Sequence, residues 1–213
     1  MSRYDFLNQY SQDGRHYSID DMVSEAASKS NTNDAIHIMN AFSHKLTSDH
    51  IDRLYHMPPP KSSIIGFDTN RLKSRLILHP DAPNHIVDTH FHELGPHEQA
   101  QIAHTRILSP VNVESSVSDY IESTHPSYAS KTLAKSLMQT QAVEPHHIDA
   151  LLRHVDPSYM ATNDRLPKES IVHLWNLHKD HPIVSKHLPL VTEYNATLSD
   201  SDRRELRTMF ERN

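Results

Sequence analysis

The segment VDTHFHELGPHE, residues 87–98, carries residue types that could bind a metal ion. His90 and His92 are separated by one residue, with Asp88 just before them. In a β-strand, residues two apart point to the same face and could share one ion, whereas in an α-helix they lie about 200° apart around the axis. The chemistry of this segment therefore depends on the backbone that carries it.

Composition favours a helical backbone. The chain has only three glycines, too few for a fold that needs many tight hairpins or phosphate-binding loops. Its thirteen prolines fall mostly between segments in which apolar residues recur at i, i+3 and i+4. The absence of cysteine excludes disulfides, thiolate nucleophiles and Cys-ligated zinc. These features together predict an all-α fold with short proline-containing linkers.

Length and charge restrict the possible classes of protein. The 213 residues suit one domain, and the net charge of −6 disfavours a polyanion-binding surface over the whole molecule. No stretch approaches the roughly 18 apolar residues of a membrane span, and the first residues do not resemble a signal peptide. We therefore expect a cytoplasmic protein that does not associate with membranes.

The chain aligns with itself as a series of helix–linker–helix units. The second helix of each unit has an early apolar residue that we expect to be buried. These anchors are Ile51, Ile86, Val117, Ile148, Ile171 and Leu206. They are 35, 31, 31, 23 and 35 residues apart, which indicates a period of about 31 with one shortened unit. The first helices are predicted near 34–44, 68–78, 97–108, 127–139, 158–164 (short) and 183–194.

Units such as LILHPDAPNHIVDTHFHEL, residues 76–94, resemble those of HEAT-like repeat proteins of the bacterial and phage type. The resemblance covers about residues 33–210 and implies a right-handed α-solenoid of about five to six helical hairpins, because one hairpin cannot bury its apolar face alone. We expect residues 33–213 to form this repeat domain and residues 1–32 to form an N-terminal helical cap. A non-repetitive helical bundle is the alternative.

In this fold His90 and His92 lie in a second helix and cannot readily bind one ion together. The pattern Val-Asp-x-His-x-His also resembles that of amidohydrolases, but only over six residues, and their barrel needs strands, more residues and more glycines. We therefore expect no catalytic residues, no metal and no cofactor. A metal ion held between adjacent hairpins stays open as an alternative, with histidines from His85, His97, His104 and the doublet His146-His147 as ligands.

Local polar patterns predict helix starts and surface pairs. Ser18 and Asp21 form a predicted capping box, and the candidate N-caps of second helices are Ser48, Asn84 and Ser199. Carboxylates precede basic residues by four positions once per unit, where side chains are neighbours on a helix. The predicted ion pairs are Asp52 with His56, Asp88 with His92, and Asp149 with Arg153.

The leading functional hypothesis is a non-enzymatic adaptor whose second helices present a concave surface to a protein partner. It rests on the repeat and on the lack of a nucleophile elbow, phosphate loop or dinucleotide motif. The candidate contact residues are Arg53, His56, Asp88, His92, His147, Arg153, His154 and Trp175. Trp175 also has the spacing of a core residue beside Ile171 and Leu174.

Two other classes stay open. DNA-alkylation-repair glycosylases are similar in architecture, but a nucleic-acid partner is disfavoured because it requires a basic groove. Second helices here carry acidic residues instead, namely Asp52, Asp88, Asp119 and Asp149. A structural component of a phage particle or assembly is the other alternative, in which copies of the chain pack together as a homo-oligomer.

Overall fold

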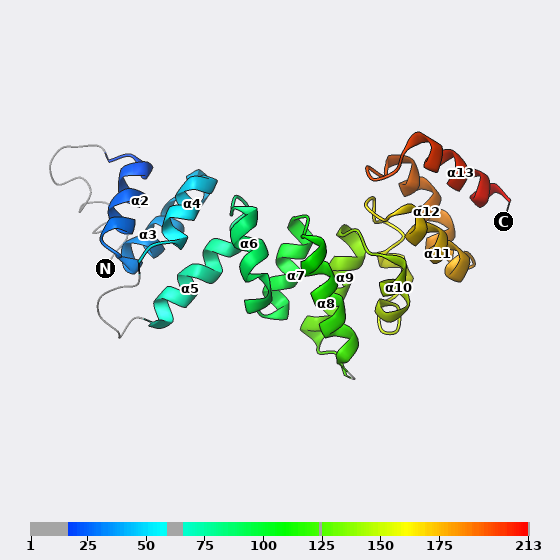
Figure 1. The fold of residues 1–213 in the computed structure, drawn as a ribbon, viewed down its shortest axis with the longest axis horizontal. Helices are drawn as coiled ribbons and strands as arrows, with labels where there is room; N and C mark the ends of the chain where they lie inside the picture. The colour runs from blue at the N-terminus through cyan, green and yellow to red at the C-terminus, as the bar shows by residue number, and fades with distance from the viewer. Residues whose placement is uncertain (1–16, 59–65, 124, 213) are drawn as a thin grey trace. The chain divides into compact units, whose positions relative to one another are not determined.

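The computed structural model describes residues 17–58, 66–123 and 125–212, so residues 1–16 of the predicted cap lie outside the described residues. Within these ranges all regular structure is helical and there is no β-strand, which confirms the all-α class (Figure 1). None of the helices in the described part combines the length and apolarity that a membrane crossing requires. The chain divides into two compact units, Met1–His90 and Phe91–Asn213. The predicted boundary at residue 32 stays a prediction.

The first unit contains five α-helices in its described residues. They are α2 (Ile19–Ser28), α3 (Thr32–Phe42), α4 (Ser48–Tyr55), α5 (Gly66–Ile77) and α6 (Asn84–His90), with a 3-10 turn, η1 (Ser43–Lys45), after α3. Helix α2 packs against α3 and α4, while α5 packs against α3, α4 and α6. Fully buried side chains such as Val23, Ile38 and Leu76 form the core between them.

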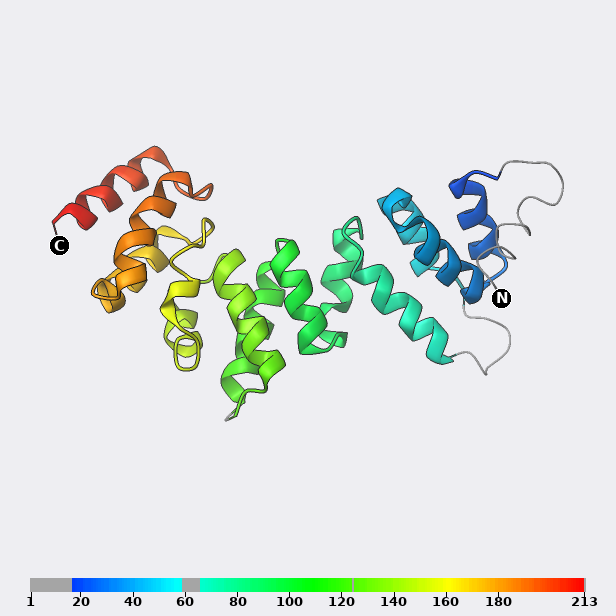
Figure 2. The same cartoon turned by 180° about the vertical axis from the view of Figure 1, so that it is seen from behind.

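The second unit continues the alternation of first and second helices. Its elements are η3 (Phe91–Glu93), α7 (Pro96–Thr105), α8 (Pro110–Glu122), α9 (Tyr128–Thr140), α10 (Pro145–Leu151), η4 (Pro157–Tyr159), α11 (Lys168–His178), α12 (Pro182–Tyr194) and α13 (Asp200–Glu211). First-position elements contact one another in the order α7, α9, η4 and α12, and second helices in the order α8, α10, α11 and α13 (Figures 1 and 2). In the second unit, first-position elements therefore stack on first-position elements, and second helices stack on second helices.

Five of the six predicted first helices are present in the described residues, with ends within three residues of the prediction. The helix predicted over 158–164 is wrong in type, because only the 3-10 turn η4 forms there. Proline at position 157 starts this turn, and the backbone then turns away so that Asn163 can reach the preceding linker. The backbone amide of Asn163 still donates locally, to the Met160 carbonyl at 3.0 Å, while the side chain makes the tertiary bond.

All six predicted anchors are buried, with at most 1% of each residue exposed. Their helix positions differ, however. Ile51, Ile148 and Ile171 are the fourth residues of their helices, whereas Val117 is the eighth residue of α8 and Val113 occupies the fourth position. The near-constant spacing of the anchors therefore does not correspond to one fixed position within each helix.

The capping predictions were right at two helices and off by one residue at two others. Asp21 donates its amide to Ser18 Oγ at 3.1 Å, and Asp202 donates to Ser199 Oγ at 3.2 Å. Helix α4 is capped by Thr47 instead of Ser48, and Asn84 is the first residue of α6. Burial of Leu46 explains the shift at α4, because an apolar residue directly before the cap packs under the first turn.

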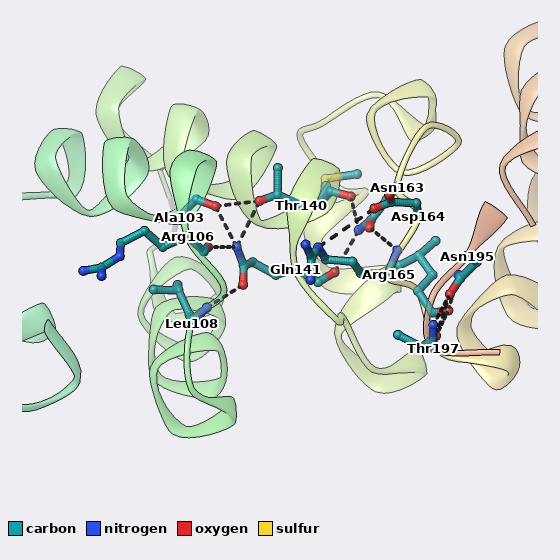
Figure 3. A network of polar contacts seen from close by, with 12 residues as sticks. Ala103, Arg106, Leu108, Thr140, Gln141, Asn163, Asp164, Arg165, Asn195 and Thr197 are labelled. Atoms are coloured by element: carbon teal, nitrogen blue, oxygen red, sulfur yellow. Dashed lines mark hydrogen bonds and ion pairs between the residues drawn. The ribbon is translucent and has the colours of Figure 1, made fainter. Parts of the chain in front are cut away.

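A buried amide side chain occupies successive linkers of the second unit, at Gln141, Asn163 and Asn195 (Figure 3). Asn163 donates from Nδ2 to the carbonyls of Met138 and Gln141, both at 2.8 Å, and accepts the Arg165 amide at 2.9 Å. Asn195 repeats this arrangement one hairpin later, since its Nδ2 donates to the carbonyl of Leu166 and its Oδ1 accepts the Thr197 amide. Each amide thus ties its own linker to the preceding hairpin.

Gln141 and His79 also connect a linker to an earlier segment, through a longer amide side chain and through an imidazole ring. Gln141 Nε2 donates to the carbonyls of Ala103 at 2.6 Å and Arg106 at 2.7 Å, while its Oε1 accepts the Leu108 amide at 2.9 Å. In the first unit, His79 Nδ1 accepts the Asp81 amide, so Nε2 carries the proton and donates to the Ser43 carbonyl at 2.9 Å. We call His79, Gln141, Asn163 and Asn195 the linker side chains.

Replacing Asn163 with alanine is expected to destabilise the protein by about 2–4 kcal/mol, because two buried carbonyls and one amide lose their partner together. Asn176→Ala, at an exposed position on α11, is the matched control and should stay within about 0.5 kcal/mol of wild type. Urea denaturation followed by circular dichroism measures both. Equal effects of the two substitutions would contradict a structural role for the linker side chains.

Candidate interaction surface

Charged side chains link successive helices within the first unit. Asp20 on α2 contacts Arg53 on α4 at 2.6 Å and His50 at 3.4 Å. Asp52 on α4 contacts His85 Nε2 on α6 at 2.9 Å. In each pair, a carboxylate from one helix meets a basic or imidazole group from a later helix.

The second unit has the same arrangement along its second helices. Glu114 on α8 lies 2.9 Å from His147 and 3.7 Å from His146, both on α10. Asp149 on α10 lies 3.0 Å from His173 on α11. Lys168 on α11 reverses the order of the charges, because it lies 3.0 Å from Asp202 and 2.5 Å from Glu205, both on the later helix α13. We call these contacts in both units the interhelical pairs.

The predicted ion pairs within single helices are only partly present. Asp52 and His56 are 3.5 Å apart, as predicted. Asp149 is instead paired with His173, because α10 ends at Leu151 and Arg153 lies beyond the helix. Helix α6 likewise ends at His90, so His92 lies in the 3-10 turn η3 and is not one helical turn above Asp88. Short helices thus favour pairs between helices.

This ending of α6 also answers the question raised by the His-x-His motif. His90 is the last residue of α6, with its ring centroid 5.1 Å from that of Tyr55. His92 is exposed in η3, and Phe91 between them is buried. The β-strand that would place both imidazoles on one face is not formed in this part of the structure.

The interhelical pairs change the acidity of the groups at the C-terminal end. A hydrogen bond from the Ser199 hydroxyl, together with the Lys168 ammonium, lowers the pKa of Asp202 from 3.8 to about 2. Hydrogen bonds to Glu205 and Asp202 in turn raise the pKa of Lys168. In the first unit, the hydrogen bond from Arg53 lowers the pKa of Asp20. Folding therefore favours the charged form of each of these groups.

The lowered pKa of Asp202 predicts a specific acid dependence. Because the folded state holds Asp202 ionised, its contribution is complete above about pH 4 and is lost as the pH falls towards 2. Asp202→Asn should lower the stability at pH 7 and flatten the loss of stability between about pH 4 and 2. Denaturant titrations at a series of pH values measure this slope. Asp180→Asn, at an exposed position, should retain the wild-type slope, and an unchanged slope in Asp202→Asn would contradict the assignment.

The structure places the predicted contact residues in different environments. Exposed side chains are His56, Asp88, His92, Arg153 and His154. Arg53 is held in the pair between α2 and α4. His147 and Trp175 are buried, with 4% and 5% of each residue exposed, so neither presents much surface to a partner. Trp175 packs edge-on against Phe210, with ring centroids 4.7 Å apart, and this is the core environment expected from its spacing.

An exposed apolar surface lies on α12, where the sequence had not indicated one. Ile183, Leu190 and Tyr194 are 42%, 58% and 82% exposed. They are seven and four residues apart, which places them within about 40° of one another around the helix axis. The opposite side of α12 buries Val184 and Leu188 in the core. We call Ile183, Leu190 and Tyr194 the α12 stripe. In the sequence, the stripe is recognisable only as apolar residues on a second face of this helix, in addition to those that the core buries.

A second feature is a polar pocket of about 270 Å³ beside the linker of Gln141. Its lining residues are His104, Thr105, Arg106, Ile107, Gln139, Thr140, Asp164 and Arg165. The Asp164 carboxylate lies 3.9 Å from Arg165 Nε and partly balances the positive charge there. This internal carboxylate makes the pocket a weaker site for an anion than its arginines alone suggest.

Comparisons with models of protein families, with curated proteins and with solved structures found no match. Function must therefore be inferred from the chemistry of the surface. The α12 stripe and the interhelical pairs are the features available for this inference. They suit different ligands, because one is apolar and the other is rich in carboxylate and imidazole groups.

Proposed function

We propose that this protein is a non-enzymatic protein-binding module and that the α12 stripe contacts the partner. The observation that carries the proposal is the exposure of three large apolar side chains on one face of a well-packed helix. Exposed large apolar side chains that share one face of a helix often mark protein–protein contacts. Tyr194 adds an aromatic residue of the type that often dominates binding energy.

The proposed partner presents an apolar helix face with a carboxylate at its edge. Lys186 is exposed and lies about 60° around α12 from Ile183, so its ammonium borders the stripe. At the other end, Glu193 is already paired with Arg207 through two hydrogen bonds. An acidic residue beside the partner's apolar face would therefore meet Lys186, and the fit is that of one helix packing against another.

The proposed architecture is a HEAT-like α-solenoid. Two features support it: like elements contact like elements along each unit, and the linker side chains recur from one hairpin to the next. Stacked hairpins with nearest-neighbour contacts are characteristic of such repeats. The proposed binding surface differs from the second-helix surface predicted from the sequence, since α12 occupies a first-helix position.

A nucleic-acid partner receives less support than a protein partner. Binding to phosphates requires unpaired basic side chains along one surface. Arg53, Lys168 and Arg207 are each paired with carboxylates of this chain. Asp119 and Asp149 are exposed on second helices and would repel phosphate groups.

Affinity purification of the chain from its native host, followed by mass spectrometry, identifies the candidate partner. The decisive measurement is then calorimetry with the purified partner. Leu190→Asp should weaken binding about tenfold or more, because it places a charge in the apolar contact. Ser185→Asp, exposed on another side of α12, is the matched control and should bind like wild type.

Two outcomes would overturn this proposal. Equal binding by Leu190→Asp and wild type would place the contact elsewhere on the molecule. Light scattering that shows a dimer of the wild type, dissociated by Leu190→Asp, would make a second copy of the chain the occupant of the α12 stripe. Circular dichroism of both variants checks that the helices remain folded.

A further inference from the structure

We propose that Glu114, His146 and His147 form a binding site for a divalent transition metal such as zinc. Glu114 lies on α8, and the two histidines lie in the first turn of α10. Each residue offers one ligand atom, and the three atoms lie within 4.8 Å of one another. Among the described residues, this is the one group of three or more carboxylate and imidazole side chains that meets this distance.

The separations suit a tetrahedral ion. Zinc binds imidazole nitrogen and carboxylate oxygen at about 2.0–2.2 Å, so neighbouring ligand atoms in a tetrahedron are about 3.3 Å apart. Glu114 Oε2 lies 2.9 Å from His147 Nε2 and 3.7 Å from His146 Nε2, on either side of that value. Small rotations of the exposed Glu114 and His146 side chains would place all three atoms around one ion.

The environment of His147 is a second and independent observation. Its residue is 4% exposed, and both ring nitrogens are shielded from solvent. Although Nε2 lies close to the Glu114 carboxylate, no described residue forms a hydrogen bond with either nitrogen. A buried polar atom without a partner is costly. A metal ion between the imidazole and the carboxylate would satisfy Nε2.

The donor set also indicates the kind of metal and its remaining coordination. Imidazole nitrogens favour zinc, copper, nickel and iron over calcium or magnesium. Two histidines and one glutamate are a set that binds zinc with one position open for water or another ligand. The side chains of His146 and Glu114 are 65% and 57% exposed, so the open position faces solvent. A side chain of another molecule could also occupy it.

A related cluster in the first unit provides an internal control. Asp52 Oδ1 lies 2.9 Å from His85 and 3.5 Å from His56. The two imidazole rings of this cluster are stacked with centroids 6.3 Å apart, whereas those of His146 and His147 are 3.8 Å apart. One carboxylate and two imidazoles are therefore present here as well, but with a wider separation of the rings, and we expect this cluster to bind zinc weakly.

The test is calorimetry of Zn²⁺ alone with the full chain at neutral pH. Wild type should bind one tight equivalent. Glu114→Gln and His146→Ala should each weaken this binding by about tenfold or more, since even changes outside the ligand set cost 10–100-fold. Asp52→Asn and His85→Ala should retain it. Both test positions are largely exposed, so the variants are expected to fold, and circular dichroism verifies this.

Two further measurements distinguish specific binding at this site from non-specific binding of zinc to the nineteen histidines of the chain. Bound Co²⁺ should give the visible absorption bands of a low-coordinate site in wild type and lose them in Glu114→Gln. Zinc should also raise the unfolding temperature of wild type more than that of Glu114→Gln, because binding stabilises the folded state. Identical affinity, spectra and stabilisation in the two proteins would overturn the proposal. Leu190→Asp should bind zinc like wild type, so the two proposals fail independently.

Discussion

A polar side chain that is buried between helices must find its hydrogen bonds inside the protein, and here it finds them in the preceding hairpin. Gln141, Asn163 and Asn195 each donate to carbonyls near the end of an earlier helix or linker. Asn163 also donates to the carbonyl of Met138, which lies in the last turn of α9, where carbonyls have no partner within the helix. Within the second unit, the position of each of these linkers is therefore coupled to that of the preceding hairpin.

The many histidines gain a physical explanation from the same coupling between hairpins. His79 uses both ring nitrogens in a linker, while His85 and His173 pair with carboxylates of an earlier helix. Imidazole suits these places because it is short, can donate and accept, and needs no full charge to bond. The doublet His146-His147 follows the same pattern, but two imidazoles at one carboxylate also create a set of metal ligands.

Local features of the sequence predicted the helices well. Apolar periodicity, proline at the linkers and the scarcity of glycine all act within a few residues, so they need no knowledge of the fold. The prediction failed over 158–164, where the Asn163 side chain bonds to residues more than twenty positions earlier, a contact that no local pattern records. Similarly, the cap of α4 is Thr47 and not Ser48, since burial of Leu46 decides where the helix begins.

The sequence by itself determined the all-α class, the order of the helices and the burial of the anchors, because these depend on short-range spacing and on the transfer of apolar residues from water. Only the tertiary structure decided which polar groups meet. Glu114 precedes His146 by thirty-two residues, and Asp149 meets His173 instead of Arg153. Such pairs depend on how hairpins stack, and no local pattern records the distance between side chains on different helices.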